Sequence, residues 1–251
     1  MSSDPTERFS SRVEDYLRYR PSYPAEVIAF LERECGLAAQ SRVADIGSGT
    51  GLLSELFLRF GCRVDGVEPN PEMRAAGERL LAGWPRFHSV AGRAEATTLP
   101  DGSADLVSAG QAFHWFDSGA ARSEFQRILT PNGWVVLVWN ERLVSEGFLA
   151  DYEALLHRYS PDYAQVDHRR VDDAAIARFF AGAPWRSAVF PNRQHFDWQG
   201  LRGRVLSSSY VPLDCEPLLE ALARLFERYQ QAGQVSFLYE TKLYAGRLGS
   251  C

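Results

Sequence analysis

The residue types best suited to chemistry gather in a glycine-rich segment, DIGSGTG, which runs from Asp45 to Gly51. It follows a short apolar run that predicts a buried strand and precedes a run that predicts a helix. Glycines let the backbone approach a ligand closely, and a helix N-terminus presents N–H groups that lack intrahelical partners. The glycines are spaced GxGxG, whereas a dinucleotide-binding loop has the spacing GxGxxG. The segment therefore predicts a ligand-binding loop, and its spacing disfavours a pyrophosphate.

Two acidic residues accompany this loop. Asp45 immediately precedes it, and Glu68 closes the next predicted strand. A carboxylate at Asp45 would repel a pyrophosphate but would pair with a ligand ammonium group. A carboxylate at the end of the second strand accepts hydrogen bonds from ribose hydroxyls. Either residue alone could be a cap or a solvated strand end, but together they predict a ligand that carries an amino group and a ribose.

The candidate general base is His114, in the segment QAFHWF that follows a predicted strand at residues 104–110. Open parallel sheets bind ligands at the carboxyl ends of their strands. An imidazole with a pKa of about 6.5 can remove a proton near neutral pH. The alternative is that His114 only lines a pocket, as part of an aromatic wall with Phe113, Trp115 and Phe116. Both interpretations stay open.

A regular alternation of strands and helices positions these residues. The first predicted strand runs from Arg42 into the glycine loop. Further strands are predicted at residues 63–68, 87–92, 104–110 and 134–140, a turn at 130–133, and helices at 25–35, 52–61, 71–81 and 118–129. Such alternation predicts a parallel sheet with helices on both faces. After Asn140 the order changes, with helices predicted at 147–159, 172–181 and 216–231 and strands at 187–198 and 236–247.

We expect a single domain over residues 1–251, in which a core at 25–140 is completed by the two late strands. Residues 7–23 and the helices within 145–234 are expected to form a cap. With 45% hydrophobic and 24% charged residues, the chain has the composition of an ordinary globular protein.

The composition also excludes several kinds of partner. A net charge of −5 without a basic block disfavours nucleic acid. The apolar run WVVLVW is far shorter than the roughly 20 residues of a membrane helix. The N-terminus shows no apolar signal-peptide core, so we expect a cytoplasmic location and no membrane partner. The four cysteines are widely spaced, which predicts neither a metal site nor a disulfide framework.

The motifs resemble the class I S-adenosylmethionine-dependent methyltransferases. The resemblance rests on VADIGSGTG, GVEPNPEM, GRAEATTLPDGSADLV and LTPNGWVVLV. RYRPSYP and GQAFHWFD are similar to a small-molecule subgroup that includes trans-aconitate methyltransferase-like enzymes. The resemblance implies an α/β fold with a seven-stranded, doubly wound, Rossmann-like sheet of order 3-2-1-4-5-7-6, its last strand antiparallel, and a helical cap. It also implies S-adenosyl-L-methionine as cofactor, a small-molecule methyl acceptor as partner, and a monomer or homodimer.

The resemblance also assigns the site residues. The implied contacts to the cofactor are made by Asp45, Gly47, Ser48, Gly49, Thr50, Gly51 and Gln111 at its methionine part, Glu68 at its ribose, Pro69, Asn70, Met73, Ala94 and Glu95 at its adenine, and Tyr16 and Arg20 from the cap. The implied acceptor site is formed by His114, Phe113, Trp115, Tyr23, Trp139 and Tyr210. No metal is implied.

Two other functions stay open. One is a catalytically silent regulator or scaffold that binds S-adenosylmethionine. The other is a nicotinamide-dependent dehydrogenase, which the GxGxG spacing disfavours. The acceptor atom, whether oxygen, nitrogen or carbon, is not indicated by the sequence.

Overall fold

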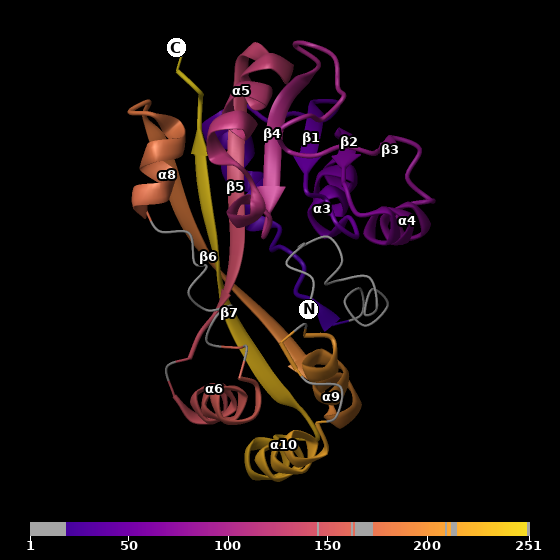
Figure 1. The fold of residues 1–251 in the computed structure, drawn as a ribbon, viewed down its shortest axis with the longest axis vertical. Coiled ribbons are helices and arrows are strands. Elements are labelled where there is room, and N and C mark those ends of the chain that lie inside the picture. Colours follow the sequence, from indigo (N-terminus) through magenta and orange to yellow (C-terminus); the bar gives the residue numbers. More distant parts are fainter. Residues whose placement is uncertain are drawn as a thin grey trace.

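The computed structural model describes residues 19–144, 146–161, 163, 173–208, 210–211 and 215–249. One seven-stranded sheet with the order β3-β2-β1-β4-β5-β7-β6 runs through these parts of the chain (Figure 1). Its strands are β1 (Arg42–Ile46), β2 (Arg63–Val67), β3 (Phe87–Val90), β4 (Ala104–Gly110), β5 (Leu129–Arg142), β6 (Trp185–Phe196) and β7 (Val235–Gly246). The first five are parallel, and β7 lies antiparallel between β5 and β6. The predicted strand order and antiparallel last strand are confirmed.

Helices cover both faces of the parallel part of the sheet, because its strands carry apolar side chains on both faces. Val43 and Leu106 point into an apolar cluster shared with α2 (Glu26–Cys35) and α3 (Leu52–Phe60). Their chain neighbours Ala44 and Val107 point into a second cluster with α5 (Ser118–Ile128) and α8 (Asp173–Phe180). The glycine loop and β4 are therefore held between two packed layers. The remaining helix of this half is α4 (Pro71–Leu80).

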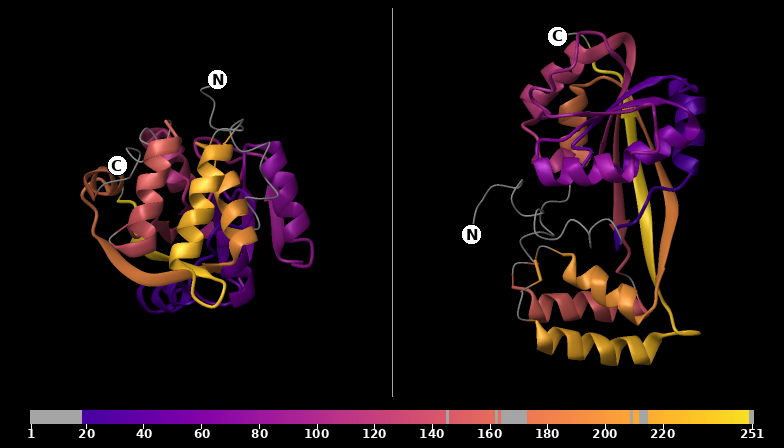
Figure 2. Two further views of the ribbon diagram at one scale, coloured as in Figure 1. Left: turned by 90° about the horizontal axis from the view of Figure 1, so that it is seen from below. Right: turned by 90° about the vertical axis from the view of Figure 1, so that its right-hand side faces the viewer.

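The three strands β5, β6 and β7 continue past the carboxyl edge of the parallel strands (Figure 1). Three helices pack around the continuation as a separate layer (Figure 2). They are α6 (Gly147–Tyr159), α9 (Trp198–Leu206) and α10 (Glu216–Tyr229). Phe148, Tyr152, Leu222 and Phe237 lie in the apolar cluster of this layer. We call the three helices with the continuation of the strands the cap. Helix α8 does not belong to it, because its buried residues pack with α5.

Two elements differ from the sequence-based prediction. Residues 130–133, predicted as a turn, lie within β5, where Ala104 pairs with Leu129 but Leu106 pairs with Trp134. The extra residues form a bulge, and Pro131, which has no N–H to donate, lies within it. Helix α9 was not predicted, because the two glycines in WQGLRGRVL disfavour a helix. Asp197 caps this helix through a 2.7 Å bond from Gly200 N, so β6 ends earlier than expected.

No helix in the described ranges is long and apolar enough to cross a bilayer. Residues 7–18, expected to contribute to the cap, lie outside the described residues.

Candidate active site

The glycine loop lies between β1 and α3, at the carboxyl end of β1. Gly47 N and Ser48 N donate to the carbonyl of Val67, at 2.8 and 3.1 Å, and tie the loop to the end of β2. The three glycines of the loop have φ values of 67, 56 and 88°, in the left-handed region. A Cβ atom at Gly51 would lie 2.5 Å from the side chain of Leu81. Glycine is therefore required here for both its backbone conformation and its small size.

Asp45 lies in β1, next to Ser108 of β4 in the ladder. Ser54 Oγ donates to Asp45 Oδ2 at 2.6 Å, and Ser108 Oγ donates to Oδ1 at 2.9 Å. Burial, which leaves Asp45 1% exposed, raises the pKa of this carboxyl to about 6, although the serine hydrogen bonds lower it. The carboxyl is thus oriented on both oxygens and largely removed from water. Such a group gains strongly from a neighbouring cation.

Glu68 directly follows β2 and faces the glycine loop. Gly49 N donates to Glu68 Oε2 at 2.9 Å, and Asn70 N donates to Oε1 at 2.8 Å. Burial raises the pKa of Glu68, and the two backbone hydrogen bonds lower it. Each carboxylate oxygen can still accept a second hydrogen bond. The side chain is therefore fixed by the backbone while it keeps the capacity to bind two neighbouring hydroxyls.

Some residues predicted at the adenine also have structural partners. The Asn70 side chain caps α4 by accepting from Glu72 N and Met73 N. Met73 packs on the glycine loop, since a Cβ atom at Gly49 would lie 3.4 Å from its Cε. Pro69 is half-buried and Ala94 is buried. The Glu95 side chain accepts from Asp117 N at 2.9 Å, ahead of α5.

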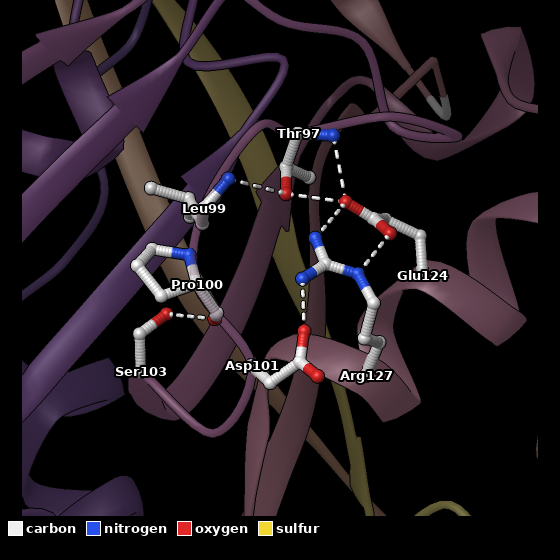
Figure 3. A network of polar contacts seen from close by, with 7 residues as sticks. All are labelled: Thr97, Leu99, Pro100, Asp101, Ser103, Glu124 and Arg127. Carbon is white, nitrogen blue, oxygen red and sulfur yellow. Dashed lines mark hydrogen bonds and ion pairs between the residues drawn. The ribbon is translucent and has the colours of Figure 1, made fainter.

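A polar network anchors the loop that carries Ala94 and Glu95 (Figure 3). Thr97 donates to Glu124 Oε1 through its N at 2.7 Å and its Oγ1 at 2.6 Å. Arg127 Nε and Nη2 donate to both oxygens of Glu124, at 2.8 and 2.7 Å, and Nη1 pairs with Asp101. Glu124 of α5 thus holds Thr97 directly and is linked to Asp101 through Arg127.

Replacing Glu124 with glutamine should lower the free energy of unfolding by about 1–3 kcal/mol at pH 7, because charged hydrogen bonds are lost. Hydrogen bonds from Arg127 hold the pKa of Glu124 at about 2. Its stabilisation is therefore present above the unfolded pKa of about 4.3 and is lost as the pH falls toward 2. Urea titrations at pH 7 and pH 4 should show a smaller difference between variant and wild type at pH 4. The control is Glu55→Gln, whose exposed pair with Arg59 should contribute less than about 0.5 kcal/mol. Equal effects of the two variants at pH 7 would contradict this role.

The chain turns sharply where β4 ends. Gln111 has a φ of 57°, which is unusual for a residue with a side chain. Its N donates to Val138 O at 2.9 Å, and its Nε2 donates to Asn140 O at 3.2 Å. A Cβ atom at Gly110 would lie 2.5 Å from the hydroxyl oxygen of Tyr23. Tyr23, which was predicted at the acceptor site, is buried in an apolar cluster of the core. Strained backbone of this kind gathers at ligand sites.

The aromatic segment after β4 forms a short 3₁₀ helix, η2 (Phe113–Trp115). Phe113 is 5% exposed and packs edge-on against Phe179 and Trp139, at centroid distances of 4.8 and 6.2 Å. His114 and Trp115 are only half-buried, and their rings lie 4.7 Å apart. Of the residues predicted at the acceptor site, Phe113 and Trp139 are thus packing residues of the apolar cluster, whereas His114 and Trp115 keep accessible surface.

Residues 19–23 cross the continuation of the sheet. Asn140 Nδ2 and Asn192 Nδ2 both donate to Ser22 O, at 3.2 and 2.7 Å. Arg20, predicted to reach the cofactor or substrate, is half-buried within this segment. Tyr16, predicted beside it, lies outside the described residues. Side chains of β5 and β6 therefore hold the segment next to the carboxyl edge of the sheet.

The cap contains buried polar residues that the sequence analysis missed. Tyr210, predicted at the acceptor site, lies here with its ring 4.8 Å from that of Tyr163. It interacts electrostatically with Arg142 and Arg204. Neither arginine could be singled out among the chain's 27 basic residues, because burial in the cap is not visible in residue type or spacing.

Comparison with known proteins identifies the family. Residues 44–137 match the sequence family described as methyltransferase domain. An uncharacterized methyltransferase-like protein of Schizosaccharomyces pombe is 33% identical over 248 residues, which are 94% of each chain. The chain belongs to the S-adenosylmethionine-dependent methyltransferase family. An uncharacterized methyltransferase of Mycobacterium bovis is 39% identical to this methyltransferase over 150 residues, 60% of this chain and 59% of that relative. The match thus spans about three-fifths of that relative's length.

Solved structures show the same fold. A protein assigned as a type II methyltransferase from Anaeromyxobacter dehalogenans superposes with a TM-score of 0.67 at 22% identity, covering 92% of this chain and 98% of that one. A methyltransferase assigned to an antibiotic biosynthesis pathway of Anabaena variabilis gives a TM-score of 0.63 at 22% identity, covering 92% and 99%. Both superpositions extend well beyond residues 44–137, the part of the chain that matches the sequence family.

The donor set of this methyltransferase fits its cofactor. Asp45 would offer a buried carboxylate to an ammonium group, and Glu68 would offer two acceptor oxygens to a ribose. In the loop between them, Thr50 Oγ1 is buried and has no hydrogen-bond partner among the described residues. Within the same residues, no group of three or more histidine, cysteine or acidic side chains is placed to hold a metal ion.

Proposed function

We propose that this methyltransferase transfers a methyl group from S-adenosylmethionine to a small-molecule acceptor bound between the carboxyl edge of the sheet and the cap. The observation that carries the proposal is the pair of buried carboxylates, Asp45 and Glu68, on either side of the glycine loop. Both are held by hydrogen bonds at both oxygens. A site so rigid orients its ligand before the reaction, which is the main contribution of a protein to this chemistry.

The bound cofactor supplies a methyl group on a positively charged sulfur. Asp45, the glycine loop and Glu68 would hold this cofactor, and its sulfonium would act as the leaving group when the nucleophile of the acceptor takes the methyl group. An acceptor that loses a proton in this step needs a base, and His114 is the half-buried imidazole at the end of β4. An acceptor that is already an anion needs none. In either case Gln111, Trp115 and residues 19–23 shape the edge and exclude water.

Thermal shift and turnover measurements test the proposal. S-Adenosylhomocysteine at about 100 times its Kd should raise the Tm by roughly 5–10 °C, whereas NAD should leave it unchanged. Transfer of labelled methyl groups is then measured over acids, phenols and amines, with trans-aconitate included for the subgroup resemblance. We expect turnover with one acceptor class. Stabilisation by S-adenosylhomocysteine without any turnover would favour a silent binding protein. Stabilisation by NAD alone would overturn the cofactor assignment.

A further inference from the structure

The interior of the cap holds a group of polar side chains that the cofactor site does not use. We call it the arginine cluster; it consists of Arg142 at the end of β5, Tyr152 and Glu153 of α6, Tyr163, and Arg204 of α9. Arg204 is 6% exposed, and Tyr152 is 0% exposed. Charged groups removed from water to this extent require partners of opposite charge.

The charges of the arginine cluster do not balance. Arg142 pairs with Glu153, and the Tyr163 hydroxyl donates to the same carboxylate at 2.7 Å. The partners of Arg204 are neutral: its Nη1 donates to Ser208 Oγ at 3.1 Å, and its guanidinium interacts with Tyr239. No carboxylate among the described residues pairs with Arg204. Two guanidinium groups and one carboxylate therefore leave one buried positive charge.

The cluster also has unused hydrogen-bond donors. Arg142 Nε, Arg204 Nε and the Tyr152 hydroxyl are buried, and none has an acceptor within the described ranges. Burial raises the pKa of Tyr152, so its hydroxyl is protonated at neutral pH. Buried donors without acceptors destabilise the folded state. Three such donors beside an unbalanced positive charge match the needs of an oxyanion.

The arrangement of β5, β7 and α6 brings these donors together. Tyr239 of β7 lies directly opposite Arg142 of β5 in the antiparallel ladder, and it interacts with Arg204. The Tyr152 ring lies 4.7 Å from the Arg142 guanidinium carbon and interacts electrostatically with Arg204 as well. Arg142 follows Asn140 by two residues, which is about 7 Å along a strand, and Asn140 O contacts Gln111 at the carboxyl edge. The cluster is thus in the cap but close to the edge.

We propose that Arg204, together with Arg142 Nε and the Tyr152 hydroxyl, binds a carboxylate of the methyl acceptor. A monocarboxylate balances the single excess charge, whereas a phosphate dianion would leave an excess of negative charge. The bound carboxylate is not the methylated group, because it lies farther along the strands than the edge at which the cofactor binds. The acceptor is therefore an organic acid that carries its nucleophile elsewhere. This inference rests on the proposed function for two statements: that the acid is the acceptor, and that its bound carboxylate is not the methylated group.

A first experiment requires no knowledge of the acceptor. The Tm of Arg204→Met is compared with that of wild type without ligands, using Arg224→Gln as control, since Arg224 is 70% exposed on α10. Removal of an unbalanced buried charge should leave the Tm unchanged or raise it. A purely structural arginine would give a Tm several degrees lower, and that result would overturn the proposal. Tyr152→Phe, which removes only a hydroxyl, serves as a second variant and should behave in the same way.

A second experiment measures the carboxylate directly. Wild type is titrated by thermal shift with acetate, succinate, benzoate and phenylacetate, each next to its neutral amide and next to inorganic phosphate. At least one acid should stabilise the protein saturably while its amide does not. Arg204→Met should lower the affinity for that acid by about 10- to 100-fold. Arg224→Gln should bind as wild type does. No response to any acid, an equal response in Arg204→Met, or stronger stabilisation by phosphate would each overturn the assignment.

Titration with S-adenosylhomocysteine separates this proposal from the proposed function. Arg204→Met should bind it with unchanged affinity, and a loss would show that the arginine holds the cofactor's own carboxylate instead. If wild type binds the acids but not S-adenosylhomocysteine, the anion site stands and the methyl-transfer proposal fails.

Discussion

Replacing Asp45 with asparagine is expected to weaken the binding of S-adenosylhomocysteine at least tenfold at pH 7. In the proposed site this buried carboxylate accepts from the ammonium group of the ligand, and hydrogen bonds to charged groups contribute about 1.5–3 kcal/mol. Isothermal titration calorimetry measures the change. The matched control is Asp105→Asn. Asp105 lies at the start of β4, away from the carboxyl edge of the sheet, and pairs with Arg42 on the surface. Unchanged affinity in Asp45→Asn would remove Asp45 from the cofactor site.

The pH dependence of binding provides a second test of the same residue. Burial raises the pKa of Asp45 to about 6, and in the proposed site the ammonium group of the ligand would pair with the ionised form. Affinity should therefore fall about tenfold between pH 7 and pH 5 in wild type, but stay nearly constant in Asp45→Asn.

The stability of the ligand-free protein should depend on pH in the opposite direction. A raised carboxyl pKa stabilises the fold below the unfolded pKa, and this stabilisation is lost as the pH rises through about 6. Asp45→Asn should thus fold at least as stably as wild type at pH 7.

The central strands of the parallel half, β1, β4 and β5, could be predicted because most of their residues are buried on both faces of the sheet, whereas the edge strand β3 has no fully buried residue. The run from Val135 to Val138 consists of apolar residues that are all buried, and such an uninterrupted apolar run predicts a strand. Elements that depend on distant partners could not be predicted. The continuation of β5 to Arg142 is stabilised by pairing with Tyr239, nearly a hundred residues later in the chain. Helix α9 lacks local helix propensity and is stabilised by burial of Leu201 and Val205 in the cap.

The candidate site shows the same division. Asp45, Glu68 and the glycine loop are adjacent to strand ends, so strand order alone brings them together. Asn70 and Glu95 were expected at the adenine, but their side chains also bond to backbone N–H groups near helix starts. Such capping depends on where a helix begins. Arg204 stands out only because no described carboxylate reaches it, and an absence of this kind exists only in three dimensions.

The largest kinetic effect is expected for His114→Ala. If the acceptor's carboxylate is held by Arg204, the methylated atom is a different one, and a hydroxyl or amine there has a proton to lose. A positioned base contributes about 10²–10⁴-fold to such a step. His114→Ala should lower kcat by that order. S-Adenosylhomocysteine binding should stay nearly unchanged, because His114 follows β4 and does not belong to the pair of carboxylates, Asp45 and Glu68, proposed to hold the cofactor. Steady-state kinetics and calorimetry on the same preparation measure both quantities.

A kcat profile over pH distinguishes a base from a pocket wall. Imidazole titrates near pH 6.5 in water, so a wild-type profile governed by His114 should rise through the region of pH 6–7, and the variant should lose that limb. Trp115→Phe is the matched control, since Trp115 lies on the same short helix with its ring 4.7 Å from that of His114. It should alter KM for the acceptor more than kcat, because it removes contact surface but no titrating group. A loss below about tenfold in His114→Ala with an unchanged profile would show that the imidazole only lines the pocket, and that the acceptor reaches the site already deprotonated.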